Sequence, residues 1–306
     1  MPMKILVTGI SGFVGGRLAP RLVADGHEVR GMSRHAGPSP AGVDLVRADV
    51  VSGEGLAPAL EGIEVAYYLI HSMEPSHDGA FQAREHRAAH NFVRAARRAG
   101  VRRVVYLGGI VPPDGQASAH LASRLAVEEV LLGATDESVA FRASIVIGAL
   151  SRSFRFLVRL VERLPVLVVP AWGHHRTAPI DQRDVIEFLV RAANAPQVAG
   201  RSLDIAGPDE VAYAQLIDLI REAMLLDRPT VGLSRITATP IASRISSVIA
   251  GEDWELIGPL MDGLQYDLLP RNSQAAELLG VRRHSLERAI NRALRDWEKT
   301  ESLKAR

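Results

Sequence analysis

Residues Ile5 to Gly16 read ILVTGISGFVGG, and this stretch decides the fold. An apolar run typical of a β-strand ends in a threonine, glycine then recurs at positions 9, 12 and 15, and an amphipathic helical pattern follows over Arg17–Ala24. A strand that leads through a glycine loop into a helix N-terminus can hold phosphate, because backbone N–H groups and the positive end of the helix dipole face the anion. Side chains at these glycines would block the turn, the approach of a pyrophosphate or the helix–strand packing. The loop therefore predicts a dinucleotide site.

Strand-like and helix-like segments alternate through the first half of the chain. Such alternation predicts a parallel sheet with right-handed crossovers and helices on both faces, that is, an α/β fold with a doubly wound parallel Rossmann sheet. The expected strands are Lys4–Thr8, His27–Met32, Asp44–Ala48, Val65–Ile70, Arg103–Leu107 and Val139–Arg142. One helix is expected to end at Gly100, and another is expected over Ala119–Leu132.

The pattern changes after Gly148. A helix is expected from Ser151 to Pro165, and from Gly207 onward the chain is mainly helical. We therefore predict a dinucleotide-binding core and a smaller, mainly helical C-terminal substrate-binding lobe. The core comprises residues 1–148 and is completed by about 183–206, and the lobe comprises 149–182 and 207–306.

The composition excludes several classes of protein. A formal net charge of +1 provides no basic field for nucleic acid, and the absence of cysteine rules out disulfides and thiolate chemistry. The most apolar stretch, Phe154–Val169, contains charged residues and a proline, so no membrane span or membrane partner is expected. His86 and His90 fit a solvated helix face better than a metal site, so no metal is expected. No export signal precedes the first strand, which predicts a cytoplasmic protein.

The end of the second strand selects between the two nicotinamide dinucleotides. An acidic residue there would favour NAD, but the chain reads Arg-Gly-Met-Ser-Arg over residues 30–34. Ser33 and Arg34 offer a hydroxyl and a guanidinium fork suited to a 2′-phosphate, which favours NADP, with NADPH preferred over NADH. The alternative is that Arg34 is a surface arginine beside a Gly/Pro loop. Asp49 either accepts a hydrogen bond from the adenine amino group or only closes a turn.

The motifs Thr8-Gly9-x-x-Gly12-x-x-Gly15, Ala48-Asp49-Val50 and Gly100–Leu107 resemble those of the extended and atypical short-chain dehydrogenase/reductases. The segment Tyr67–Met73 is similar to an atypical NAD(P)H-binding branch related to the NmrA-like regulators. The resemblance implies a nicotinamide near residues 69–72 and 143–148, and homodimers are common in that family, although no residue here demonstrates one. The expected cofactor-binding residues are Gly9, Ser11, Gly12, Phe13, Val14, Gly15, Ser33, Arg34, Asp49, Val50, Leu69, Ile70, His71 and Ser72.

The residues that typically carry catalysis in that family are replaced. Typical members place a serine after the fifth strand and a Tyr-x-x-x-Lys motif on the following helix. Here Gly108 stands at the serine position, His120 at the tyrosine position and Arg124 at the lysine position. The candidate catalytic residues are therefore His120, Arg124 and His71. The alternatives are a structural or substrate-contact role for His120 and a cofactor-pocket wall for His71, and a neighbouring Arg124 disfavours the imidazolium that His120 would need.

These residues lead to an NADP(H)-dependent oxidoreductase that acts on a small, fairly apolar substrate without the Ser-Tyr-Lys triad. Hydride transfer does not require the tyrosine, because the cofactor supplies the hard chemistry and general acid catalysis contributes typically about 10²–10⁴-fold. Two alternatives stay open. One is a non-catalytic NADP(H)-binding redox sensor or assembly protein, and the other is a non-redox cyclase or isomerase on the same scaffold.

Overall fold

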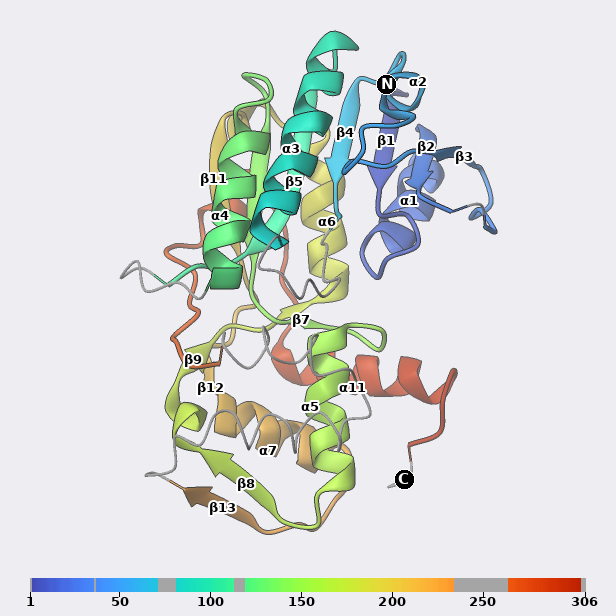
Figure 1. Ribbon diagram of the computed structural model, residues 1–306. Helices are drawn as coiled ribbons and strands as arrows, with labels where there is room; N and C mark the ends of the chain where they lie inside the picture. Colours follow the sequence, from blue (N-terminus) through green and yellow to red (C-terminus); the bar gives the residue numbers. More distant parts are fainter. Residues whose placement is uncertain (1, 36, 71–80, 113–118, 234–263, 304–306) are drawn as a thin grey trace.

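A seven-stranded parallel sheet forms the centre of the molecule (Figure 1). The computed structural model describes residues 2–35, 37–70, 81–112, 119–233 and 264–303. The strand order β11-β6-β5-β4-β1-β2-β3 runs outward from β1 in both directions, which confirms the predicted doubly wound α/β fold. The strands are β1 (Lys4–Thr8), β2 (Glu28–Ser33), β3 (Val43–Arg47), β4 (Val65–Tyr68), β5 (Arg103–Gly109), β6 (Val139–Ala143) and β11 (Arg201–Ile205).

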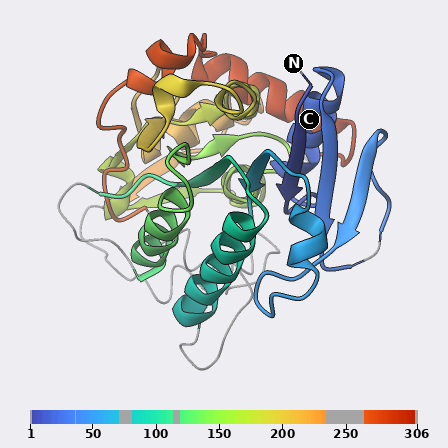
Figure 2. The same ribbon diagram turned by 90° about the horizontal axis from the view of Figure 1, so that it is seen from above.

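Helices cover both faces of this sheet, and Figure 2 shows α3 and α4 on the side opposite α6. One face carries α1 (Gly15–Ala24), α6 (Gln182–Ala192) and α10 (Gln274–Leu279). The other face carries α2 (Leu56–Leu60), α3 (Phe81–Arg98) and α4 (Ala119–Leu132). Because both faces are covered, the strands read as nearly continuous apolar runs.

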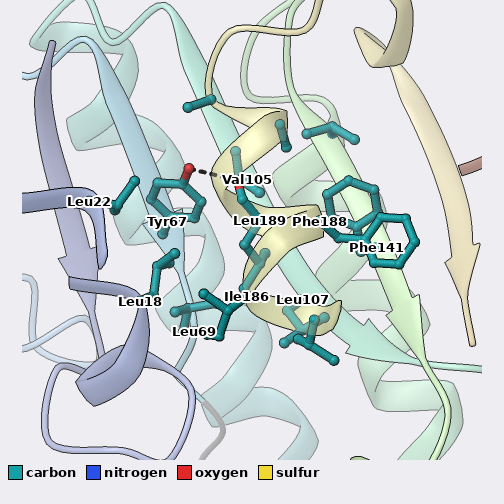
Figure 3. Packing of buried hydrophobic residues seen from close by; sticks show 14 of the residues in the cluster. Leu18, Leu22, Tyr67, Leu69, Val105, Leu107, Phe141, Ile186, Phe188 and Leu189 are labelled. Atoms are coloured by element: carbon teal, nitrogen blue, oxygen red, sulfur yellow. Dashed lines mark hydrogen bonds between the residues drawn. The ribbon is translucent and has the colours of Figure 1, made fainter. Parts of the chain in front are cut away.

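Neighbouring residues of β4 pack alternately into the hydrophobic cores on the two faces of the sheet. The Tyr67 ring packs with Leu18 and Leu22 of α1, and its hydroxyl donates a hydrogen bond to the Leu189 carbonyl of α6 at 2.8 Å (Figure 3). Tyr68 points to the opposite core, where its ring meets Phe92 of α3 edge to face at 5.0 Å between ring centroids. Each fully buried Leu or Phe side chain contributes about 1.5–3 kcal/mol to the free energy of folding. This packing on both faces holds the strands of the sheet in position.

A third core joins the helices of the C-terminal region. Leu157 of α5, Leu216 of α7 and Trp297 of α11 are buried there together. These helices are α5 (Arg152–Arg163), α7 (Tyr213–Ala223) and α11 (Leu286–Glu298). Three two-stranded sheets accompany them: β7 (Val146–Ile147) with β10 (Ile180–Asp181), β9 (Arg176–Thr177) with β12 (Val211–Ala212), and β8 (Leu167–Pro170) with β13 (Thr230–Leu233). Short 3₁₀ turns cover Ala171–His174 and Pro196–Val198.

Several boundaries differ from those expected. Helix α1 begins at Gly15, two positions before Arg17, because the glycine loop itself makes the first turn. Residues 69 and 70 lie beyond the end of β4. The one-turn helix α2 was too short to be predicted, and the two-residue strands carry too little periodicity. Residues of α10, which fall in the range predicted for the lobe, pack instead on the sheet. Within the described ranges, no helix combines the length and apolar character needed to cross a bilayer.

Candidate functional site

Three glycines shape the loop between β1 and α1, each for a different steric reason. Gly9 has a φ of +64°, and an added Cβ would lie 2.9 Å from the Leu69 carbonyl oxygen at the end of β4. A Cβ at Gly15 would lie 2.3 Å from the Gly9 carbonyl oxygen, so the helix sits directly on the loop. Gly12 donates its N–H to the same oxygen at 2.9 Å, and its own added Cβ would lie 3.1 Å from it. The loop therefore has the tight form that the sequence predicts.

The same loop presents open backbone donors. The N–H groups of Arg17 and Leu18 already bond to the Val14 carbonyl, at 3.1 and 2.9 Å. Those of residues 13–15 have no backbone acceptor within the part of the chain that the structure describes. They lie at the N-terminus of a ten-residue helix with no acidic residue in its first turn. This cradle fits the diphosphate of a dinucleotide, since the helix dipole and the unpaired N–H groups favour an anion.

Arg17 places a positive charge beside this loop. Its Nη1 donates to the Phe13 carbonyl at 3.0 Å, and its guanidinium carbon lies 4.6 Å from the centroid of the Phe13 ring. Burial lowers the pKa of Arg17, with Asp296 acting in the opposite direction, but a guanidinium stays charged at neutral pH. The sequence analysis missed Arg17, which looks like an ordinary helix-surface residue. The signal was its i,i+4 spacing from Phe13.

The Phe13 ring also connects the loop to the segment after β6. An added Cβ at Gly148 would lie 2.8 Å from Phe13 Cζ and 2.3 Å from Gln182 Oε1. A side chain at position 148 would therefore displace the ends of the Phe13 and Gln182 side chains. The structure brings together the glycine loop and the 143–148 segment that the family resemblance places near the nicotinamide.

Thr8 joins the ends of β1 and β4 at the point where the strand order reverses. Its buried Oγ1 accepts the Leu69 N–H at 2.9 Å. Leu69 is buried, Ile70 is half-buried, and both follow the strand at the edge where ligands bind in doubly wound sheets. His71 and Ser72 lie outside the described residues. The sequence analysis did not single out Thr8, because its partner is distant along the chain.

The residues expected at the adenosine end lie after β2 and β3. Ser33 ends β2, and its Oγ accepts the His35 N–H at 3.3 Å, while Arg34 follows on the surface. Asp49 Oδ1 accepts the Val51 N–H at 2.7 Å, as the turn interpretation expects. An ionised carboxylate has further acceptor capacity, so this turn is compatible with an adenine contact.

Two other expected cofactor residues take different positions. Val50 is buried, and its carbonyl accepts a hydrogen bond from Asn91 Nδ2 at 3.0 Å, which anchors the turn to α3. Ser11 is exposed at the tip of the glycine loop, next to Gly12. The backbone of Val50 therefore holds the turn in place. The side chain of Ser11 is exposed and so accessible to a ligand.

The positions that correspond to the family's catalytic residues lie along β5 and α4. Gly108 has no room for a serine, because an added Cβ would lie 2.8 Å from Tyr106 Cε1. Arg124 is half-buried and lines a pocket, and its carbonyl lies 3.5 Å from the Tyr106 hydroxyl. His120 lies in α4, but its side chain is outside the described part of the structure.

This pocket, of about 200 Å³, lies at the carboxyl ends of β5 and β6, where α5 and α7 meet the sheet. Most of its wall is apolar, with Arg124, Ser144, Ser153 and Tyr213 as the side chains that bring polar groups. The described lining residues are Gly109, Ile110, Leu121, Arg124, Ala143, Ser144, Ile145, Ser153, Phe156, Leu157, Tyr213, Leu264 and Leu268.

A family described as NAD(P)H-binding matches this chain over residues 9–133. Residues 9–133 of the chain are therefore similar to an NAD(P)H-binding domain. The matched residues run from the first glycine of the loop to the end of α4, and so include the dinucleotide cradle and Arg124.

The chain is similar to several curated proteins, among them a reductase and a dehydrogenase. A 2-alkyl-3-oxoalkanoate reductase of Stenotrophomonas maltophilia is 26% identical over 274 residues, which cover 79% of this chain and 82% of the reductase. A 3-beta-hydroxysteroid dehydrogenase of Mycolicibacterium neoaurum is 37% identical over 114 residues, 34% of this chain and 31% of that enzyme. An uncharacterized protein of Mycobacterium tuberculosis is 28% identical over 268 residues. The match covers 85% of this chain, which spans about a quarter (27%) of the length of that mycobacterial relative.

Solved structures share the fold over nearly the whole chain. A nucleoside-diphosphate-sugar epimerase from Staphylococcus aureus superposes with a TM-score of 0.77 at 15% identity, covering 94% of this chain and 100% of that one. MoeE5, solved with UDP-glucose and NAD, gives a TM-score of 0.72 at 21% identity, with 97% and 98% of the two chains covered. The NAD(P)H-binding domain and the C-terminal region thus form one known architecture.

Proposed function

We propose that this protein is an NADP(H)-dependent oxidoreductase that acts on a small, fairly apolar substrate without the Ser-Tyr-Lys triad. The observation that carries this proposal is that the glycine loop and the apolar pocket lie on the same edge of one sheet. The loop follows β1, and the pocket lies beside the ends of β5 and β6. With about 4.8 Å between neighbouring strands, β1 and β6 are about 14 Å apart, so one extended ligand can reach both.

Different residues of the chain bind different parts of NADP(H). The loop N–H groups and Arg17 hold the diphosphate, and Arg34 with Ser33 selects the 2′-phosphate that distinguishes NADP from NAD. Asp49 receives the adenine, and residues 69–70 with 143–148 line the nicotinamide side. When bound, the cofactor supplies the hydride.

Arg124 is one of the residues that line the pocket, which supports its choice among the candidate catalytic residues. A guanidinium does not give up its proton at neutral pH, so Arg124 stabilises negative charge that develops on the substrate instead of protonating it. The proton then comes from water or from one of the other two candidates, His120 and His71. A substrate with an activated double bond needs the missing tyrosine least, because water can protonate the product after hydride transfer.

The relatives support this proposal in a limited way. Two of them have names that describe oxidation or reduction at an oxygen-bearing carbon, a 3-beta-hydroxysteroid and a 2-alkyl-3-oxoalkanoate. The steroid dehydrogenase matches over only 34% of this chain. The substrate is therefore inferred from the pocket and not from these names.

The test is isotope transfer. NADPH that carries deuterium at one face of C4 is incubated with the protein and a panel of enones, imines and quinones. Appearance of the label in a reduced acceptor supports the proposal. If NADPH binds but no acceptor receives the label, the redox sensor or assembly protein is favoured, and turnover of a substrate without any cofactor favours a cyclase or isomerase.

A further inference from the structure

Tyr213 carries a buried polar group that makes no hydrogen bond of normal geometry with the described part of the chain. It is the first residue of α7, it is 1% exposed, and it is one of the residues that line the apolar pocket. Its hydroxyl oxygen is buried and has no hydrogen-bond partner among the described residues. Buried hydroxyls in native proteins are nearly always satisfied, so this one needs an explanation.

The neighbouring hydroxyls do not provide the missing partner. Ser144, which also lines the pocket, lies with its Oγ 2.9 Å from Thr177 Oγ1, and these two buried hydroxyls share one hydrogen bond. The Thr177 hydroxyl lies near that of Tyr213 and lowers its pKa, although the two groups do not have hydrogen-bond geometry, and the larger effect is burial, which raises that pKa to about 12. The Tyr213 hydroxyl is therefore neutral at physiological pH and remains available as a donor.

Packing alone does not require the hydroxyl. The Tyr213 ring meets Trp172 edge to face with 6.2 Å between ring centroids, and its backbone N–H donates to the His175 carbonyl at 3.0 Å. A phenylalanine would fill the same space and keep both contacts. These two contacts leave the hydroxyl of Tyr213 available to a ligand that brings an acceptor into the pocket.

We propose that the Tyr213 hydroxyl is the polar anchor of this pocket and donates a hydrogen bond to a carbonyl or alcohol oxygen of an otherwise apolar ligand. That this ligand is the substrate rests on the proposed function, whereas the hydrogen bond itself does not. Tyr213 holds the oxygen but does not lose its own proton, since a buried tyrosinate beside Asp267 would be unfavourable.

The test compares two probes that differ by one oxygen. Benzylideneacetone is an apolar enone, and 1-phenyl-1-butene has a methylene group in place of its carbonyl. Their binding to the full chain with saturating NADP⁺ is measured by ligand-observed NMR titration. Wild type should bind the enone more tightly than the hydrocarbon, and Tyr213→Phe should weaken enone binding about tenfold while leaving the hydrocarbon unchanged.

Tyr67→Phe is the matched control. Tyr67 of β4 is equally buried, its hydroxyl bonds to the Leu189 carbonyl, and neither residue is among those that line the pocket, so loss of this hydroxyl should change neither affinity. Tyr213→Phe should also unfold at the same temperature as wild type or higher, because its hydroxyl makes no hydrogen bond of normal geometry with the described residues.

Three results would overturn the anchor: equal enone affinity in wild type and Tyr213→Phe, no binding of either probe to wild type, or a clear drop in the unfolding temperature of Tyr213→Phe. The proposed function fails separately. Loss of enone binding in Tyr213→Phe without any deuterium transfer from labelled NADPH would keep the anchor and reject the oxidoreductase. Deuterium transfer together with unchanged enone binding would do the reverse.

Discussion

The ring of Tyr106 fills the space that a side chain at Gly108 would need. A Cβ added at Gly108 would lie 2.8 Å from Tyr106 Cε1 and 3.1 Å from its hydroxyl oxygen. Tyr106 is 1% exposed and its ring lies 6.3 Å from that of Tyr68, measured between centroids, so it has little freedom to move aside. Glycine at position 108 and the buried Tyr106 ring therefore go together, because a serine at position 108 would collide with this ring.

Gly108→Ser should consequently destabilise the protein without creating activity. Forcing extra atoms into a packed core costs typically about 1–3 kcal/mol. The free energy of unfolding is measured by urea denaturation, and NADPH oxidation is followed with the enone panel. Gly109→Ser is the control, because the nearest atoms to an added Cβ at Gly109 lie at 4.0 Å. Equal stability of the two variants would contradict the steric account.

Two alanine substitutions in the glycine loop should distinguish an effect on the fold from an effect on NADPH binding. Gly15→Ala should abolish NADPH binding and lower stability, since its Cβ would lie 2.3 Å from a backbone oxygen that cannot move without the helix. Gly12→Ala meets its nearest atom at 3.1 Å, so the fold should tolerate it better. Its methyl group would still face the diphosphate, and NADPH affinity should fall at least tenfold.

These affinities are measured by NADPH fluorescence titration alongside thermal unfolding. Gly133→Ala, after α4, is the control, because an added Cβ there makes only ordinary contacts from 3.4 Å outward. Unchanged NADPH affinity in both loop variants would reject the cradle.

Arg34→Ala tests the choice of cofactor. A charge-assisted hydrogen bond contributes about 1.5–3 kcal/mol, so NADPH affinity should fall about 10–100-fold while NADH affinity changes less than about threefold. Both are measured by titration at one ionic strength. Arg98→Ala, an exposed arginine at the end of α3, controls for the loss of one positive charge. Equal losses for NADPH and NADH would remove the NADP assignment.

The parts of the site that the sequence could predict are local in the chain. The glycine loop is recognisable because its strand, turn and helix follow one another within about twenty residues, and its glycines stand at a fixed spacing. The Thr8–Leu69 hydrogen bond joins residues that are 61 positions apart, and no pattern in either segment announces it. The same holds for the hydroxyls of Ser144 and Tyr213, which meet at one pocket only after the lobe has packed on the sheet. Tertiary packing, not local propensity, selects such residues.

The buried ion pair between α4 and β6 should be essential for stability. Arg142 donates two hydrogen bonds to the Glu128 carboxylate, at 2.7 and 2.6 Å, and the two side chains are 11% and 4% exposed. Arg142→Met should cost about 3–5 kcal/mol, because it leaves an uncompensated buried carboxylate. Urea denaturation measures this loss. The double change Arg142→Met with Glu128→Leu should recover much of it, and no recovery would show that the two residues act independently.

The buried hydroxyl of Tyr213 should make the free energy of unfolding decrease at high pH. Burial raises the pKa of Tyr213 from 10.0 to about 12, so between these values the folded protein binds more protons than the unfolded chain. The stabilisation linked to this proton is fully present below pH 10 and is lost as the pH rises through 12, by up to about 2–3 kcal/mol at about 1.4 kcal/mol per pKa unit. Tyr213→Phe lacks this loss, whereas the other buried tyrosines titrate in both proteins and cancel in the difference. Urea denaturation from pH 7 to 11 should therefore show the two stabilities diverging in favour of Tyr213→Phe above pH 10. Parallel curves would mean that the hydroxyl is solvated or bonded, and the pocket would then lack the donor on which its selectivity for an oxygen-bearing ligand depends.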